Sequence, residues 1–176
     1  VFASSQAADL EILLTAVLSA ERPDILKRAL VSPLFGWDAP AVAALEDQAV
    51  GEWQDRLRAY RELWLRGGIL PMLRALDDAC GIIPRLLSGP GGERAATNVL
   101  HLSELLNHHA AGCHCPPLDL LSWLRTKRAD AAGAVPADEE LLRLESDGDR
   151  VAILTIHKSK GLQFPIVFCP FVWNGS

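Results

Sequence analysis

The chain has 176 residues, 49% of them hydrophobic, and its formal net charge is −5. This length and apolar content allow a real hydrophobic core, so we expect one domain with a tail. The negative charge argues against a positively charged nucleic-acid-binding domain, because sequence-independent DNA binding depends on lysines and arginines that displace counterions from phosphates. With no run of about 18 apolar residues and no signal-peptide pattern at the start, we expect a cytoplasmic protein without a membrane segment.

Helical periodicity dominates the chain before residue 150, where apolar residues recur at spacings of three and four. Within one such stretch, Trp53, Leu57, Tyr60 and Trp64 form a stripe that belongs in a core. Prolines and glycines separate the stretches and mark their ends. We expect helices over residues 6–20, 24–31, 39–45, 50–65, 71–79, 84–87, 93–108 and 116–128.

The last two of these helices are expected to pack against each other in an antiparallel pair. Residues 129–138, which are rich in alanine and include Gly133 and Pro136, are interpreted as a flexible connector.

Two breaks between helices contain residues that could bind nucleic acid or phosphate. Phe35 and Trp37 lie in a turn over residues 32–37, where we favour core or interface packing over base stacking. Residues 89–92 read Gly-Pro-Gly-Gly, which has only a superficial similarity to a phosphate-binding loop. Because no strand precedes it and no lysine follows it, we interpret it as an ordinary loop.

Cations gather at two places on the expected helices, and two interpretations remain open for them. One is a solvated face with cations favoured near helix carboxyl ends, and the other is contact with duplex DNA ahead of a fork. The first group is Arg56, Arg58, Arg61 and Arg66, and the second is Arg125, Lys127 and Arg128.

Residues 108–115 read His-His-Ala-Ala-Gly-Cys-His-Cys and place five soft metal ligands in eight positions. Their spacing matches no standard zinc module and no C-x₂-C partner is present, so we interpret them as a loop of incidental ligands and expect no metal site. Cys113 and Cys115 are too close in sequence for an ordinary disulfide, and Cys80 and Cys169 lie in apolar runs. We therefore expect reduced thiols.

The segment 155–164, Thr-Ile-His-Lys-Ser-Lys-Gly-Leu-Gln-Phe, joins two short apolar runs of the kind found in buried parallel strands. Polar groups at the carboxyl end of such a strand can meet a phosphate or a nucleic-acid backbone. The segment is not a Walker A loop, because its lysine precedes its glycine.

Residues 155–164 closely resemble motif V of the UvrD/RecB-type superfamily 1 DNA helicases. The resemblance implies that the single-strand DNA contacts fall on Thr155, His157, Lys158 and Ser159, and the nucleotide contacts on Lys160, Gly161 and Gln163. Gln163 departs from the glutamate that is usual in the family. An amide can still accept a hydrogen bond from a ribose hydroxyl, although it carries no charge.

Three further blocks, at residues 60–76, 91–106 and 144–147, resemble the RecB-type beta chain of exodeoxyribonuclease V. The resemblance implies a mainly α fold in three parts. Residues 1–32 would lead from motor domain 2A into an insertion, 33–148 would form the inserted helical 2B-like subdomain, and 149–176 would return to a RecA-like α/β motor domain as a β-turn-β piece. Because Met72 is the single methionine, we interpret the chain as a piece of a larger protein.

The function implied by the resemblance is that of an ATP-dependent DNA helicase and exonuclease in double-strand break repair. ATP and Mg²⁺ would be the cofactors, and single-stranded DNA, duplex ends and RecC-like and RecD-like subunits the partners. No complete catalytic site is expected in this chain, since the adjacent acidic pairs at 77–78 and 139–140 point to different sides of a helix. Two alternatives remain, a UvrD-like or AddA-like helicase without such partners and a non-enzymatic helical interaction module.

Overall fold

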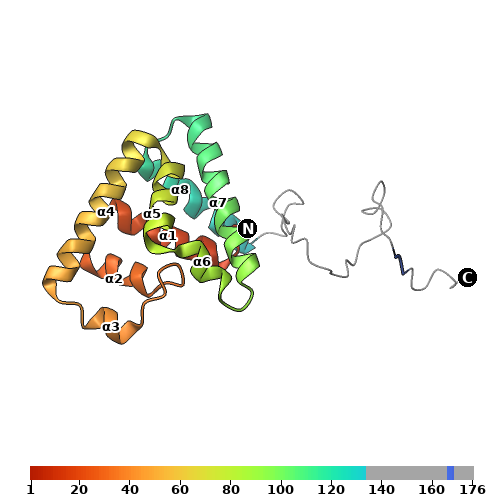
Figure 1. Cartoon of the computed structure of the whole chain (residues 1–176). Helices are drawn as coiled ribbons and strands as arrows, with labels where there is room; N and C mark the ends of the chain where they lie inside the picture. The colour runs from red at the N-terminus through yellow and green to blue at the C-terminus, as the bar shows by residue number, and fades with distance from the viewer. Residues whose placement is uncertain (134–165, 169–176) are drawn as a thin grey trace, which may run out of the picture. The chain divides into compact units, whose positions relative to one another are not determined.

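A computed structural model describes residues 1–133 and 166–168, and the first of these ranges is almost entirely helical. The expected mainly α fold is therefore confirmed. The helices in the described residues are α1 (Ser5–Leu18), α2 (Pro23–Val31), α3 (Ala39–Ala43), α4 (Asp47–Gly67), α5 (Ile69–Cys80), α6 (Ile82–Leu87), α7 (Gly92–Cys113) and α8 (Pro117–Gly133) (Figure 1).

Local sequence signals fix several of the helix ends. The Ser4 hydroxyl caps α1 by accepting a hydrogen bond of 3.3 Å from the Ala7 backbone N–H. Gly81 separates α5 from α6 by adopting a left-handed conformation with φ 62°, which a residue with a side chain rarely takes. The Asp77 carboxylate then accepts a 2.7 Å hydrogen bond from the Ile83 N–H, which satisfies a free donor at the start of α6.

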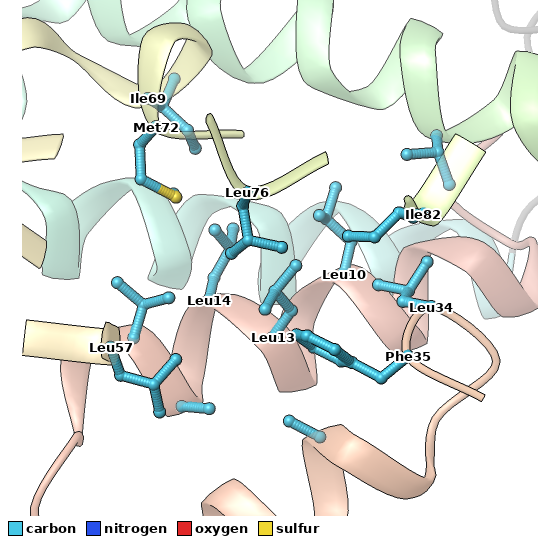
Figure 2. Close-up of a cluster of buried hydrophobic side chains, with 14 of the residues drawn as sticks. Leu10, Leu13, Leu14, Leu34, Phe35, Leu57, Ile69, Met72, Leu76 and Ile82 are labelled. Carbon is cyan, nitrogen blue, oxygen red and sulfur yellow. The ribbon is translucent and has the colours of Figure 1, made fainter. Parts of the chain in front are cut away.

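Helix α1 lies at the centre of the described unit and contacts α2, α4, α7 and α8. Leu10, Leu13 and Leu14 of this helix are each at most 1% exposed. Figure 2 shows Met72 and Leu76 of α5 near them in the same cluster of buried side chains. Each fully buried side chain of this size contributes roughly 1.5–3 kcal/mol, so α1 is the element on which the fold most depends.

The stripe of α4 packs in the core as expected, with Trp53, Leu57 and Trp64 buried and Tyr60 partly buried. Trp53 makes T-shaped ring contacts with Phe35, at a centroid distance of 5.6 Å, and with Trp37, at 5.9 Å. Phe35 is 3% exposed and points into the core in Figure 2. The core interpretation of these two residues is confirmed, and their rings stabilise the turn between α2 and α3 rather than offering a platform for bases.

Helices α7 and α8 extend about five residues past the carboxyl ends that the sequence predicts. Helix α7 continues to Cys113, beyond the expected end at residue 108, and α8 continues to Gly133, into the expected connector. The added turns contain several alanines, the best helix formers, and no proline interrupts them. Helices α7 and α8 contact each other as expected, although α8 has the wider contact with α1.

Of the expected β-turn-β piece, only Ile166, Val167 and Phe168 are described, and these three residues are not in a strand. The remainder of that piece, and residues 134–138 of the expected connector, lie outside the described residues. Residues 1–32 and 33–133 pack in the same compact unit. Their assignment to separate parts of a motor and an insertion stays a prediction. None of the helices described here is long and apolar enough to cross a membrane.

Candidate functional site

The residues predicted to contact DNA and nucleotide lie outside the part of the chain that the structure describes. They are Thr155, His157, Lys158, Ser159, Lys160, Gly161 and Gln163. Their roles stay predictions. Among the described residues, the candidate sites are the two cation groups, the glycine-rich loop, a cavity and the His–Cys cluster.

The arginines of α4 are engaged with other side chains. Ion pairs between exposed side chains contribute only about 0–1 kcal/mol each to stability. They nevertheless reduce the positive charge that these arginines could offer to a phosphate. The contacts are Arg58 with Asp55, Arg61 with Glu21 at 3.2 Å, Arg66 with Glu62 at 3.7 Å, and Arg56 over the ring of Trp53 at 5.0 Å. This pairing favours a structural, solvated face over a DNA-binding surface.

The arginines of the second group join α8 to α1. Arg125 Nε donates to Glu11 Oε1 at 3.0 Å, and its Nη2 donates to Thr15 Oγ1 at 3.1 Å. Arg128 donates to the other oxygen of the same carboxylate. Glu11 therefore holds two guanidinium groups, and both arginines stabilise the packing of α8 rather than forming a basic patch.

The glycine-rich loop between α6 and α7 does not form a phosphate cradle. A Cβ atom on Gly92 would lie 2.2 Å from the carbonyl oxygen of Leu86 and 2.7 Å from that of Leu87. Carbonyl oxygens repel an anion, whereas a phosphate site requires converging N–H groups. Residues 89–91 form a turn as expected, whereas Gly92 is the first residue of α7 and is needed there for close backbone packing.

A cavity of about 200 Å³ opens between α1, α5, α6 and α7. Its walls include Leu10, Leu13 and Val99, and the charged side chains of Arg74 and Asp77 also line it. Ser103 and Glu104 line it as well. The Asp77 carboxylate accepts a hydrogen bond from the Ile83 N–H, and the Ser103 hydroxyl donates to the Val99 carbonyl oxygen at 2.8 Å, so both of these polar groups are engaged within the fold.

The last turn of α7 brings three soft ligands together. The ligand atoms of His109, Cys113 and Cys115 all lie within 4.8 Å of one another. Cys113 and Cys115 are joined as a disulfide, so the expectation of reduced thiols at these two positions is wrong. The physical reason is the turn after α7: His114 adopts a left-handed conformation with φ 51°, and the chain reverses so that the two Cα atoms are 5.0 Å apart.

Sequence reasoning noticed these ligands but placed them in a loop, because the helix was expected to end at residue 108. With α7 continuing to Cys113, His109 and Cys113 are four residues apart on one helix and share a face. The H-x₃-C spacing was the available signal. Cys80, by contrast, is free, and burial raises the pKa of its thiol despite the nearby Arg56 and Arg85.

Comparison with known proteins relates the chain to bacterial helicase and nuclease subunits. No family model matches it. It is 37% identical over 176 residues to the RecBCD enzyme subunit RecB of Escherichia coli K12, an alignment that covers 99% of this chain and 15% of that protein. The corresponding subunit of Haemophilus influenzae is 39% identical over 175 residues, covering 98% of the chain and 14% of that protein.

Two further relatives extend the comparison. RecB of Mycolicibacterium smegmatis is 36% identical over 174 residues, covering 99% of the chain and 16% of that protein. An ATP-dependent helicase/nuclease subunit of Leuconostoc mesenteroides is 24% identical over 134 residues, covering 76% of the chain and 10% of that protein.

The class to which these matches point is that of helicase/nuclease subunits. Within that class the chain is similar to one segment of RecB subunits, which match it at 36–39% identity over nearly its whole length. It spans only 14–16% of the length of those RecB relatives.

Proposed function

We propose that the chain is part of a RecB-like subunit of an ATP-dependent DNA helicase and exonuclease that acts on double-stranded ends in break repair. The observation that carries the proposal is the match to RecB subunits along almost the entire chain, including the segment 155–164. The motor would couple ATP hydrolysis, with Mg²⁺, to movement along single-stranded DNA.

Within this proposal, residues 155–164 contact both ligands of the motor. Thr155, His157, Lys158 and Ser159 contact the DNA strand, and Lys160, Gly161 and Gln163 border the nucleotide. A movement of the DNA-contacting residues then also moves the nucleotide-contacting residues, since the two sets are adjacent in the chain. The ATP-binding lysine loop and the nuclease centre belong to other parts of the parent protein.

We propose that the helical unit formed by residues 1–133 guides DNA and partner subunits by its shape and does not bind DNA through a positively charged surface. The pairing of Arg61 with Glu21 and of Arg125 and Arg128 with Glu11 supports this assignment, because paired cations release few counterions from DNA. Such a unit can steer duplex DNA by its shape and contact RecC-like and RecD-like subunits through its surface.

The test requires the intact parent protein with its partner subunits. We expect His157→Ala to weaken the stimulation of ATP hydrolysis by single-stranded DNA, because the exchange removes one of the proposed DNA contacts. The measurement is steady-state ATP hydrolysis against DNA concentration. His101→Ala, a half-buried histidine on α7 outside the motif, is the matched control and is expected to keep the stimulation of the unmodified protein. Equal stimulation in both variants would remove His157 from the mechanism.

The match to the helicase/nuclease protein of Leuconostoc mesenteroides favours a second candidate, an AddA-like enzyme that works without RecC-like and RecD-like partners. Purified parent protein distinguishes the two. Processive unwinding of a blunt duplex by the parent without those partners would favour the AddA-like candidate, whereas a strict requirement for both partners would favour the RecB-like one. Absence of any DNA-stimulated ATP hydrolysis in the full assembly would leave a non-enzymatic interaction module.

A further inference from the structure

The carboxyl end of α7 has the features of a metal site in addition to its disulfide. His109 and Cys113 occupy positions four residues apart on one helix, so both side chains reach the same side. The turn at His114 then brings Cys115 to that side, and the three ligand atoms lie within 4.8 Å of one another. Imidazole nitrogen and thiolate sulfur are the ligands that Zn²⁺ prefers.

Aromatic packing holds the imidazole of this cluster in place. The His109 ring stacks on the indole of Trp123 in α8, with centroids 4.1 Å apart and an angle of 10° between the planes. Trp123 is itself held by the edge of Phe2, at 5.5 Å. A ligand whose ring orientation is fixed loses less conformational freedom on binding a metal ion, which is the usual role of groups that surround metal ligands.

We propose that His109, Cys113 and Cys115 bind one Zn²⁺ ion when the two cysteines are reduced, and that the disulfide is the metal-free, oxidised form of the same site. A phosphine reductant supplies the two electrons and takes the oxygen of one water molecule to become the phosphine oxide, and the two protons of that water complete the two thiols. Zn²⁺ then displaces one proton from each thiol to solvent and forms two Zn–S bonds and one Zn–N bond. A water molecule completes the tetrahedral set.

Exposure makes both forms of the site accessible. Cys113 is exposed and Cys115 is half-buried, so a reductant and a hydrated metal ion can reach the sulfur atoms. Cys80 is different, because it packs against the core and burial raises the pKa of its thiol. Among the cysteines that the structure describes, the chemistry is therefore confined to the end of α7, where the ion would connect this helix to the turn that leads into α8.

The proposal is tested by metal binding to the full 176-residue chain. The chain is reduced with a phosphine, freed of metal with a chelator and titrated with Co²⁺, whose bonds to thiolate give an intense charge-transfer absorption. We expect one Co²⁺ per chain and loss of the absorption when Zn²⁺ is added. The same titration of chain left oxidised should give no thiolate absorption. A reduced chain that gives none either would overturn the proposal.

Single substitutions then locate the ligands. Cys113→Ser and Cys115→Ser are each expected to abolish the charge-transfer absorption or to weaken binding strongly, and His109→Gln to weaken Zn²⁺ binding more than about tenfold. Cys80→Ser and His101→Gln are the matched controls, and both should bind as the unmodified chain does. Far-ultraviolet circular dichroism of each variant verifies that the helices are intact. Unchanged affinity in folded Cys113→Ser, Cys115→Ser or His109→Gln would contradict the three-ligand site.

Discussion

Asp9 lies on α1 beside the core, and burial raises the pKa of its carboxyl group although the nearby Arg128 acts in the opposite direction. Because the pKa is higher in the folded chain than the ordinary value of 3.8, the folded state holds this proton more tightly than the unfolded state does. Stability from this group is therefore present at low pH and is lost as pH rises through the folded-state pKa.

The consequence is a testable effect of pH on one variant. We predict that Asp9→Asn unfolds at a higher urea concentration than the unmodified chain at pH 7, with a gain of less than about 1 kcal/mol because water screens a half-buried charge. The gain should disappear when the pH falls below the ordinary aspartate value, where Asp9 is protonated in both states.

Asp24 provides a control for this experiment, because its pKa is shifted in the opposite direction. Its hydrogen bond from Arg22 lowers the pKa of the Asp24 carboxyl group, so this residue stabilises the fold above the ordinary pKa and loses that contribution as pH falls. Asp24→Asn should therefore lower stability at pH 7. A destabilised Asp9→Asn variant at pH 7 would show that the attraction of Arg128 outweighs the burial of the carboxylate.

At the scale of the helices, two glycines differ in the space available for an alanine side chain. Gly92 begins α7 against the carbonyl oxygen of Leu86, where a Cβ atom would lie at 2.2 Å, whereas Gly51 of α4 has no atom within 4 Å of that position. We predict that Gly92→Ala destabilises the chain by more than about 1 kcal/mol, because backbone must shift. Gly51→Ala should stabilise it by roughly 0.5–1 kcal/mol through helix propensity.

Thermal unfolding of the two glycine variants, followed by circular dichroism, measures both effects in the same assay. The prediction concerns the difference between them: the melting temperature of Gly92→Ala should fall and that of Gly51→Ala should rise relative to the unmodified chain. If Gly92→Ala were as stable as Gly51→Ala, the close approach of α6 and α7 at this point would not be a property of the folded protein.

The sequence predicted which segments become helices, because apolar spacing and breakers such as Gly81 act locally. It predicted the helix ends less well. Helix α7 passes through the exposed Gly112, since the low helix propensity of glycine is offset by the neighbouring Ala110 and Ala111. Because of this error the His109–Cys113 spacing on one helix was not recognised, and the His–Cys cluster was assigned to a loop.

The pairing of charges was outside the reach of local sequence patterns. Glu11 and Arg125 are separated by 114 residues and meet only because α8 packs on α1. Clustered arginines in the sequence therefore indicated a basic surface and a structural role equally well. The residues around His157 that are proposed to contact DNA and nucleotide were predicted in another way, from a continuous motif whose order of residue types is specific.

For the molecule as a whole, the Glu11 carboxylate is the point at which the last described helix joins the first. It is 19% exposed and accepts from Arg125 and Arg128, while Arg128 Nε is buried with no hydrogen-bond partner among the described residues. Loss of Glu11 would leave two guanidinium groups on α8 without their anion. An unpaired, partly buried charge costs more than the net value of the pair itself.

We predict that Glu11→Gln destabilises the chain by about 1–2 kcal/mol, toward the low end of the value for hydrogen bonds to charged groups because the three side chains are partly exposed. A double-mutant cycle with Arg128→Met should give a coupling of at least about 0.5 kcal/mol, since the two side chains are in contact. Glu62→Gln, which breaks the exposed pair with Arg66, is the control and should change stability by less than about 0.5 kcal/mol.

Hydrogen exchange distinguishes a local effect of Glu11→Gln from a global one. If the double ion pair fastens α8 to α1, the amides of α8 should lose protection in the variant by a larger factor than those of α4 and α5, which pack against each other through a separate contact. Equal loss of protection in all three helices would mean that α8 unfolds only with the whole core, and that the buried leucines of α8, rather than Glu11, determine its docking. Those leucines are Leu120, Leu121 and Leu124.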